Sequence, residues 1–159
     1  MKIGEGVEWG AHVCVTLTWI GAEEPVPAAT LAAWFDLPQA YLNKRLQALV
    51  RARILTSTPG ARGGFQLARP PERITLMDIV VANEGADEAF RCTEIRQRGD
   101  GVDPSAPEFR TSCAIAASMR AAEMSWRRAL AAQTIADMVA AAPAAAAERS
   151  RNRYRLMRG

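Results

Sequence analysis

The chain has 159 residues, a formal net charge of +3 and 49% hydrophobic residues, which suits one or two small domains with an ordinary core. Its three cysteines are an odd number and argue against a structural disulfide framework. The N-terminus has no visible export signal, and the uncharged stretch from Trp9 to Ala22 is too short to span a bilayer. We therefore expect a cytoplasmic protein.

The first predicted helix carries Glu8 and His12 four residues apart, so both side chains project from one helical face within reach of a shared centre. His12 is the only histidine in the chain. The alternative is a simple surface pair worth a few tenths of a kcal/mol. Cys14 falls on the apolar side of this helix and is expected to be a buried small hydrophobe.

The stretch from Pro25 to Arg73 is typical of a helix-turn-helix followed by a basic wing. A short helix is predicted over Ala28 to Asp36, and a second over Gln39 to Arg53 with Pro38 as its first residue. The second helix separates into two faces. Its inward face has Leu42, Leu46, Leu49 and Val50, and its outward face has Tyr41, Lys44, Gln47 and Arg51. This arrangement is the one a helix needs to read a major groove.

Two short alternating strands, 54–58 and 65–70, flank a glycine-rich turn and predict a hairpin with Arg62 at its tip, placed to enter a minor groove. From Lys44 to Arg73 there are seven basic residues against one acid, so charge is concentrated on the elements that would meet DNA. The alternative, two core helices and a plain loop, leaves this charge unexplained.

Beyond the wing, Thr75 to Asp78 has the spacing of a capping box and opens a helix that Gly85 could end. A long loop follows, with Cys92 and Cys113 at its two ends, where a metal centre could be clamped. The longest helix is predicted from Ser112 to about Ala132. A heptad-like stripe along it suits either a partner helix or the chain's own core: Ile115, Met119, Ala122, Trp126 and Ala129.

A second capping box, Thr134 to Asp137, predicts a short helix, and the chain closes with an Ala/Arg-rich tail that is either mobile and basic or a solvated helix. The sequence thus predicts a mainly α fold: a winged helix-turn-helix with a two-stranded β-wing and a long C-terminal dimerisation helix. The expected domains are 1–85 for DNA binding, 86–111 for the cysteine-bearing loop, 112–140 for dimerisation and 141–159 for the tail.

The run Gly-Gly-Phe-Gln-Leu-Ala-Arg-Pro-Pro-Glu-Arg-Ile-Thr-Leu-Met-Asp-Ile-Val, with the helix before it, resembles the bacterial Rrf2 family of winged-helix regulators, relatives of IscR and NsrR. The resemblance covers residues from about 5 to 140. It implies a non-enzymatic homodimer that binds double-stranded operator DNA and senses redox state, nitric oxide or iron-sulfur supply. The DNA-contacting residues that we expect are Tyr41, Asn43, Lys44, Gln47, Arg51 and Arg62.

Cluster-bearing family members mostly carry three cysteines in the loop, whereas this loop has two, and a two-iron cluster needs four protein ligands. The Gly-Val-Glu-Trp start and the Cys-Thr-Glu-Ile-Arg-Gln-Arg-Gly run resemble the redox-sensing RsrR branch. That resemblance implies a 2Fe-2S cluster held by Cys92 and Cys113 of one subunit and Glu8 and His12 of the other. Trp9, between these two ligands, is the candidate for a redox-coupled conformational change, or else an ordinary core or interface tryptophan.

Other interpretations remain open at this point. Asp103 or Glu108 could replace Glu8 as the oxygen ligand, and the cysteines could be buried packing residues. A cluster-free thiol switch or a zinc site would use the same fold. An enzyme with Cys92 as nucleophile and His12 as base is disfavoured, because no oxyanion motif or cofactor fingerprint accompanies them.

Overall fold

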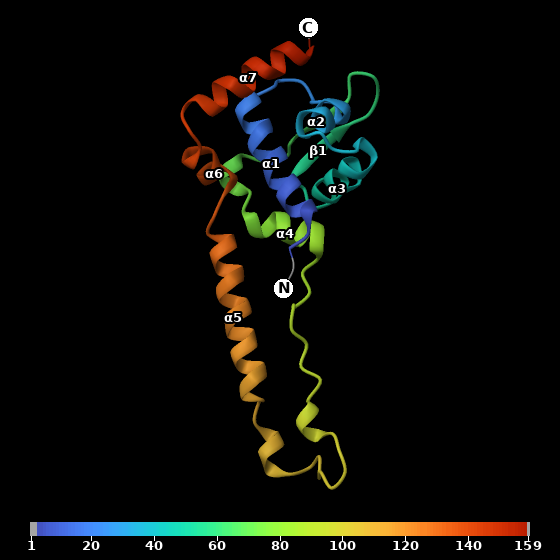
Figure 1. Ribbon diagram of the computed structural model, residues 1–159, viewed down its shortest axis with the longest axis vertical. Helices are drawn as coiled ribbons and strands as arrows, with labels where there is room; N and C mark the ends of the chain where they lie inside the picture. Colours follow the sequence, from blue (N-terminus) through green and yellow to red (C-terminus); the bar gives the residue numbers. More distant parts are fainter. Residues whose placement is uncertain (1–2, 159) are drawn as a thin grey trace. The chain divides into compact units, whose positions relative to one another are not determined.

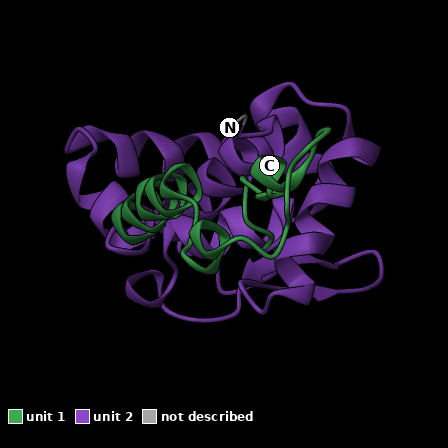
Figure 2. Ribbon diagram, turned by 90° about the horizontal axis from the view of Figure 1, so that it is seen from below, with its two compact units in different colours: residues 1, 87–129 green, residues 2–86, 130–159 purple. Residues whose placement is uncertain are grey.

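The computed structural model describes residues 3–158, so the outermost ends of the predicted first domain and of the predicted tail lie outside the described residues. The chain divides into two compact units (Figure 2). One comprises residues 87–129. The other comprises the residues before and after that stretch. The last two helices of the chain therefore pack in the same unit as the helices and strands that precede residue 87.

The larger unit is a winged helix-turn-helix, which confirms the predicted mainly α fold (Figure 1). Its elements are α1 (Glu5–Ile20), α2 (Ala28–Phe35), α3 (Gln39–Arg51), β1 (Leu55–Thr58), β2 (Gly64–Leu67), the 3₁₀ turn η1 (Pro71–Arg73), α4 (Leu76–Glu84), α6 (Ile135–Ala141) and α7 (Ala145–Arg158). Branched aliphatic side chains from nearly all of them form the core, among them Leu31, Leu42, Leu46, Leu49, Ile54, Ile74, Ile79 and Ile135. The three leucines predicted to face inward from α3 are all fully buried.

The ends of α3 differ slightly from the expected ones. Pro38 is the residue before the helix, with an extended backbone, and Gln39 is the first helical residue. At the other end, Arg53 adopts a left-handed conformation with φ 56°, which stops the helix and turns the buried Ile54 into the core. The helix therefore ends at Arg51, two residues before the predicted end.

The wing is the predicted antiparallel hairpin, with Leu55 opposite Leu67 and Thr58 opposite Gly64. A bridge between Val26 and Phe65 joins the wing to the segment before α2. Gly64 permits this approach, because a Cβ there would lie 2.2 Å from the carbonyl oxygen of Val26. The hairpin is thus held against the start of α2 at a fixed position.

Both predicted capping boxes are present, and they face each other. Thr75 accepts a hydrogen bond from the backbone amide of Asp78, and Thr134 accepts one from that of Asp137. Thr75 and Thr134 form an antiparallel bridge, and the Leu76 amide donates to the carbonyl of Gln133 at 2.9 Å. This pairing sets the starts of α4 and α6 side by side and ties the returning chain to the larger unit.

The predicted tail is the helix α7, which packs against α1 through the buried residues Ala146, Ser150 and Tyr154. Two of its arginines cap other helices: Arg151 donates to the carbonyl of Trp19 at 3.3 Å, and Arg153 donates to the carbonyl of Trp34 at 2.9 Å. Neither α1 nor α2 has a basic residue in its own last turn. These two arginines therefore supply the positive charge that helix C-termini favour. The stretch expected to be either a mobile basic tail or a solvated helix is thus a helix, and three of its residues are buried.

The smaller unit consists of the cysteine-bearing loop, with the 3₁₀ turns η2 (Ile95–Gln97) and η3 (Pro107–Arg110), and of α5 (Ala114–Ala131). The loop and α5 run alongside each other (Figure 1). Glu123 of α5 accepts from the amide of Ala89 at 3.1 Å, and Arg127 donates to the carbonyl of Asp87 at 2.9 Å. None of the helices in the described part of the chain is long and apolar enough to cross a membrane.

Candidate functional site

A groove lies between the start of α2, the outer face of α3 and the wing. Its volume is about 540 Å³, and its lining includes Ala28, Gln39, Asn43, Gln47, Ser57, Thr58, Gly60, Gly63 and Gly64. The lining combines amide and hydroxyl side chains and glycine backbone with alanine, proline and phenylalanine side chains, and none of its described residues is charged. Asn43 and Gln47, two residues predicted to contact DNA, therefore supply hydrogen-bond donors and acceptors to an uncharged groove flanked by the wing.

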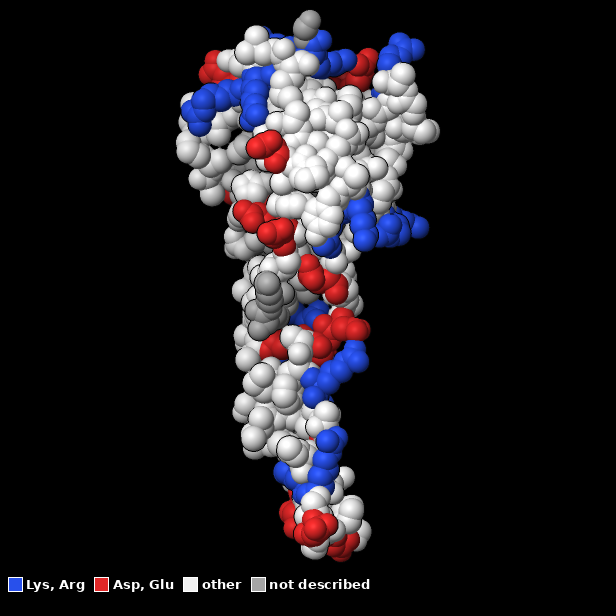
Figure 3. Space-filling view, turned by 45° about the vertical axis from the view of Figure 1, so that its right-hand side comes forward, with Lys and Arg blue, Asp and Glu red and all other residues white. Residues whose placement is uncertain are grey.

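Basic side chains border this groove. Lys44 and Arg51 are exposed on α3, and Arg62 is exposed in the wing turn. Basic residues also lie over the top of the molecule, where α7 lies, with acidic residues among them (Figure 3). The exposed cations of α3 and of the wing turn suit a polyanionic partner.

The face of α1 that carries the predicted ligands touches the two helices of the helix-turn-helix. Glu8 and His12 are both exposed, and the imidazole of His12 lies 6.2 Å from the ring of Phe35 on α2. Trp9 is half-buried, and its ring meets that of Tyr41 on α3 edge-on, with centroids 5.2 Å apart. A displacement of this face of α1 would therefore act directly on α2 and α3.

Arg45 extends this contact from Tyr41 back to the start of α1. Its guanidinium donates to Tyr41 Oη at 2.9 Å, and its Cδ lies 2.8 Å from the position of a Cβ on Gly6. The hydrogen bond to Tyr41 raises the pKa of Arg45, and the nearby charges of Glu84 and Glu5 raise it further. Arg45 thus stays cationic and joins the recognition helix to α1. The sequence did not single it out, because its partners lie in elements far apart along the chain.

The two loop cysteines are accessible free thiols. Cys92 is exposed, and Cys113 is half-buried immediately before α5. Cys14 is fully buried as predicted, and burial raises the pKa of its thiol to about 12. Within the described residues of one chain, no three His, Cys, Asp or Glu side chains come together as a metal site. Of the four predicted ligands, Glu8 and His12 thus lie on α1, and Cys92 and Cys113 lie in the loop and directly before α5.

Arg96 is a residue of the loop that the sequence did not indicate. It forms an ion pair with Glu94, with Nε and Oε1 2.6 Å apart, and it also donates to the carbonyl of Thr111 at 3.2 Å. The hydrogen bond to Glu94 raises the pKa of Arg96, and the charges of Cys113 and Cys92 act in the same direction. Both thiols therefore lie within the electrostatic reach of one guanidinium.

Known proteins resemble the chain in sequence and in fold. A family model described as Rrf2, iron-dependent transcriptional regulator, matches residues 3–141. The protein rrf2 of Nitratidesulfovibrio vulgaris is 33% identical over 94 residues, which span 59% of this chain and 63% of that protein. The matched stretch thus covers somewhat less than two thirds of that relative.

Two solved structures share the fold. CymR, the global cysteine regulator of B. subtilis, has a TM-score of 0.66 and 22% identity over 90% of this chain and 99% of its own. IscR of T. potens has a TM-score of 0.65 and 22% identity over 92% of this chain and 91% of its own. With a winged helix, an uncharged groove between its recognition helix and the wing, and a family match across most of its length, the chain belongs to the Rrf2 family of DNA-binding transcriptional regulators.

Proposed function

We propose that this chain acts as a homodimeric redox sensor whose operator binding is controlled by a 2Fe-2S cluster. Cys92 and Cys113 of one subunit, with Glu8 and His12 of the other, would hold the cluster. The observation that carries the proposal is the contact between the ligand-bearing face of α1 and the DNA-binding helices, through Trp9 and Tyr41. A change at the ligands has a short physical route to the surface that would meet DNA.

The donors suit a two-iron cluster. Two accessible thiols, one imidazole and one carboxylate supply the four ligands that such a cluster needs, and thiolate with imidazole is a combination known for this metal. Glu8 and His12 of one chain and Cys92 and Cys113 of the other would complete one four-ligand site in a twofold dimer. Bound there, the cluster would supply one-electron chemistry, and the imidazole ligand would favour a milder potential than four thiolates.

The protein's own residues would transmit the change. A change at Glu8 and His12 would alter how this turn of α1 rests on α2 and α3, because His12 lies beside Phe35 and Trp9 beside Tyr41. Trp9 lies between these two ligands and packs on Tyr41. A change of the Trp9 rotamer would therefore shift the ring of Tyr41, whose hydroxyl accepts a hydrogen bond from Arg45. We propose Trp9 as the residue of the redox-coupled conformational change. The DNA contacts proposed for this surface are Tyr41, Asn43, Lys44, Gln47, Arg51 and Arg62.

The first test is anaerobic purification followed by measurement of iron, acid-labile sulfide and the visible spectrum before and after dithionite. Equal iron and sulfide, with absorbance that bleaches on reduction, is the expected result. Glu8→Ala should lose most of the iron while the circular dichroism stays unchanged. Glu5→Ala, which removes another exposed acid of α1, is the matched control and should keep its iron. Normal iron content in Glu8→Ala would remove Glu8 from the ligand set.

Trp9→Ala tests the coupling separately from the cluster. This variant should bind iron like the wild type, because Trp9 offers no ligand atom to the metal, yet its operator affinity should no longer differ between oxidised and reduced protein. Fluorescence anisotropy with labelled operator DNA measures the two affinities. A variant that keeps the wild-type ratio would show that the signal does not pass through Trp9.

A second candidate is a cluster-free thiol switch of the same regulator. It is favoured by the two accessible free thiols, Cys92 and Cys113. It predicts a colourless protein whose operator affinity changes when Cys92 and Cys113 are oxidised to a disulfide, and changes back with dithiothreitol. Bound zinc in a colourless protein would instead indicate a zinc site.

A further inference from the structure

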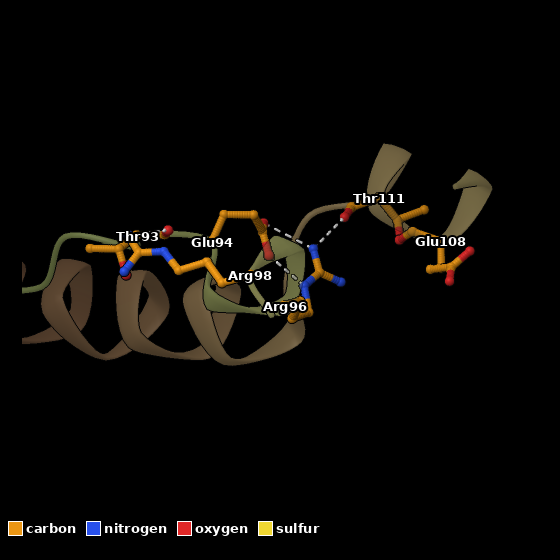
Figure 4. Close-up of polar contacts among 6 residues, drawn as sticks. All are labelled: Thr93, Glu94, Arg96, Arg98, Glu108 and Thr111. Carbon is orange, nitrogen blue, oxygen red and sulfur yellow. Dashed lines mark hydrogen bonds and ion pairs between the residues drawn. The ribbon is translucent and has the colours of Figure 1, made fainter. Parts of the chain in front are cut away.

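Arg96 connects the two stretches of the loop that carry the cysteines. Its Nε and Nη2 donate to the two carboxylate oxygens of Glu94 at 2.6 and 3.0 Å, and Nη2 also donates to the carbonyl of Thr111 at 3.2 Å (Figure 4). Glu94 stands two residues after Cys92, and Thr111 two residues before Cys113. One guanidinium therefore spans residues that are distant in sequence and adjacent to the two thiols.

Further contacts hold this connection in place. The guanidinium carbon of Arg96 lies 5.5 Å from the centre of the Phe109 ring, which restricts it from the side of η3. On the other stretch, Arg98 donates to the carbonyl of Thr93 at 3.2 Å (Figure 4). Arg96 and Glu94 are both half-buried, so water competes less with their hydrogen bonds than at an open surface.

Glu94 itself has a strained backbone. Its φ is 46°, in the left-handed region, which is strained for a residue other than glycine. Strain of this kind persists only where surrounding contacts hold the residue, and the two-point bond to Arg96 provides such a hold. The carboxylate of Glu94 is thereby turned toward Arg96 rather than toward solvent.

We propose that Arg96 is a positioning residue that holds Cys92 and Cys113 side by side as one bidentate thiol pair. Its planar fork makes two bonds to Glu94 and one to Thr111, a geometry that the single ammonium of lysine cannot reproduce. The inference rests on the proposed function, because it assumes that these two thiols belong to the sensing site. It concerns the protein before any metal arrives, so it can be tested on the metal-free chain.

The test uses dibromobimane, which becomes fluorescent when it alkylates two neighbouring thiols, on the reduced, metal-free, full-length protein. Wild type should form the cross-link within one chain, as intact mass and peptide mapping would verify. Arg96→Gln should lower the yield several-fold. Arg96→Lys should lower it similarly, because it keeps the charge and loses the fork. Cys14 does not compete, because it is fully buried.

Arg98→Gln is the matched control. It removes an arginine of the same loop that donates to a carbonyl of its own stretch, and it should cross-link like the wild type. Glu94→Gln should share the defect of Arg96→Gln, and the double variant should be no worse than either single one. Circular dichroism checks that each variant is folded. A wild-type yield in Arg96→Gln, or no cross-link in the wild type, would overturn the proposal.

Iron content separates this inference from the proposed function. If cross-linking depends on Arg96 while the wild type holds no iron, the positioning role stands and the cluster is lost. If the wild type holds iron and Arg96→Gln cross-links and loads iron equally well, the cluster stands and the positioning role is overturned.

Discussion

Burial separates Cys14 from the two thiols of the loop. Its side chain is fully enclosed in the core, and loss of solvation raises the pKa of the thiol from 9.0 to about 12, with a smaller opposing effect from Arg69. Charging this thiol in the folded chain would place an ion in an apolar environment, so Cys14 acts as a packing residue. Cys92 and Cys113 are the thiols open to chemistry at neutral pH.

The raised pKa of Cys14 predicts a pH dependence of stability. Above pH 9 the unfolded chain releases the thiol proton, whereas the folded chain keeps it until about pH 12. The contribution is therefore fully present below pH 9 and falls by about 1.4 kcal/mol per pH unit as the pH rises through this window. Urea unfolding of wild type and Cys14→Ala between pH 8.5 and pH 10.5 measures this pH dependence of the free energy of unfolding. This range covers roughly the lower half of the window.

The cavity left by Cys14→Ala lowers stability at every pH, so only the slopes are compared. The free energy of unfolding of wild type should fall more steeply with pH than that of the variant. Parallel curves would show that the thiol ionises as readily in the folded chain as in the unfolded one.

Residues with local signals could be predicted, and those defined by distant partners could not. The burial of Leu42, Leu46 and Leu49 follows from helical spacing within one segment. The role of Arg45 depends on Tyr41 of its own helix and also on Gly6 and Glu84 of two others. Nothing in a single segment carries that information, and the same holds for Arg96 and the carbonyl of Thr111, fifteen residues away.

At the scale of elements, the packing of α7 is the part of the fold that could not be predicted from the sequence. Its arginines at 149, 151, 153 and 155 alternate in a way that looks fully solvated, while the buried stripe consists of the small residues Ala146 and Ser150 with Tyr154. The helix-turn-helix was predictable because its apolar residues are large and its breaks are marked by proline and glycine. In α7 the stabilising contacts come from arginines bound to the ends of α1 and α2, which only the tertiary structure reveals.

Arg153→Gln should destabilise the winged-helix unit. The side chain bonds the carbonyl of Trp34 and stacks 4.4 Å above its ring, so its loss should cost about 1 kcal/mol, the sum expected of an exposed cation–π contact and a modest hydrogen bond. Arg155→Gln is the control, because Arg155 donates to Asn152 of its own helix. Urea denaturation followed by circular dichroism compares the stabilities of the two variants. An equal loss of stability in both would argue against a specific stabilising contact between Arg153 and Trp34.

At the scale of the whole molecule, the basic residues around the groove should determine how DNA binding depends on salt. Lys44→Gln and Arg62→Gln each remove an exposed cation beside the groove. If each neutralises one phosphate, each variant should reduce the slope of log affinity against log salt by about 1 per protomer. Arg120→Gln, an exposed cation of α5, should leave the slope unchanged. Anisotropy titrations at several salt concentrations give the slopes, and a wild-type slope for Lys44→Gln would remove that residue from the interface.

The apolar stripe of α5 is where a second subunit should bind. Ile115 is 70% exposed and Met119 44% exposed, whereas the contacts of α5 with its own loop are made from another face, through Glu123. Large apolar side chains exposed on one face of a helix lower their free energy by packing against a partner helix. The stripe predicted from heptad spacing is thus open to solvent in the single chain and suited to a twofold interface.

The variant Ile115→Glu with Met119→Glu should therefore be a monomer in sedimentation velocity. Its operator affinity should fall roughly 100-fold or more, because one winged helix then binds a half-site without the help of the second. Ala121→Glu, which places the same charge on an exposed position off the stripe, should remain dimeric. Because Cys92 and His12 would serve the cluster from different subunits, the monomer should also lose its iron. A monomer with normal iron content would mean that one chain supplies all four ligands, and an unchanged dimer would place the interface elsewhere.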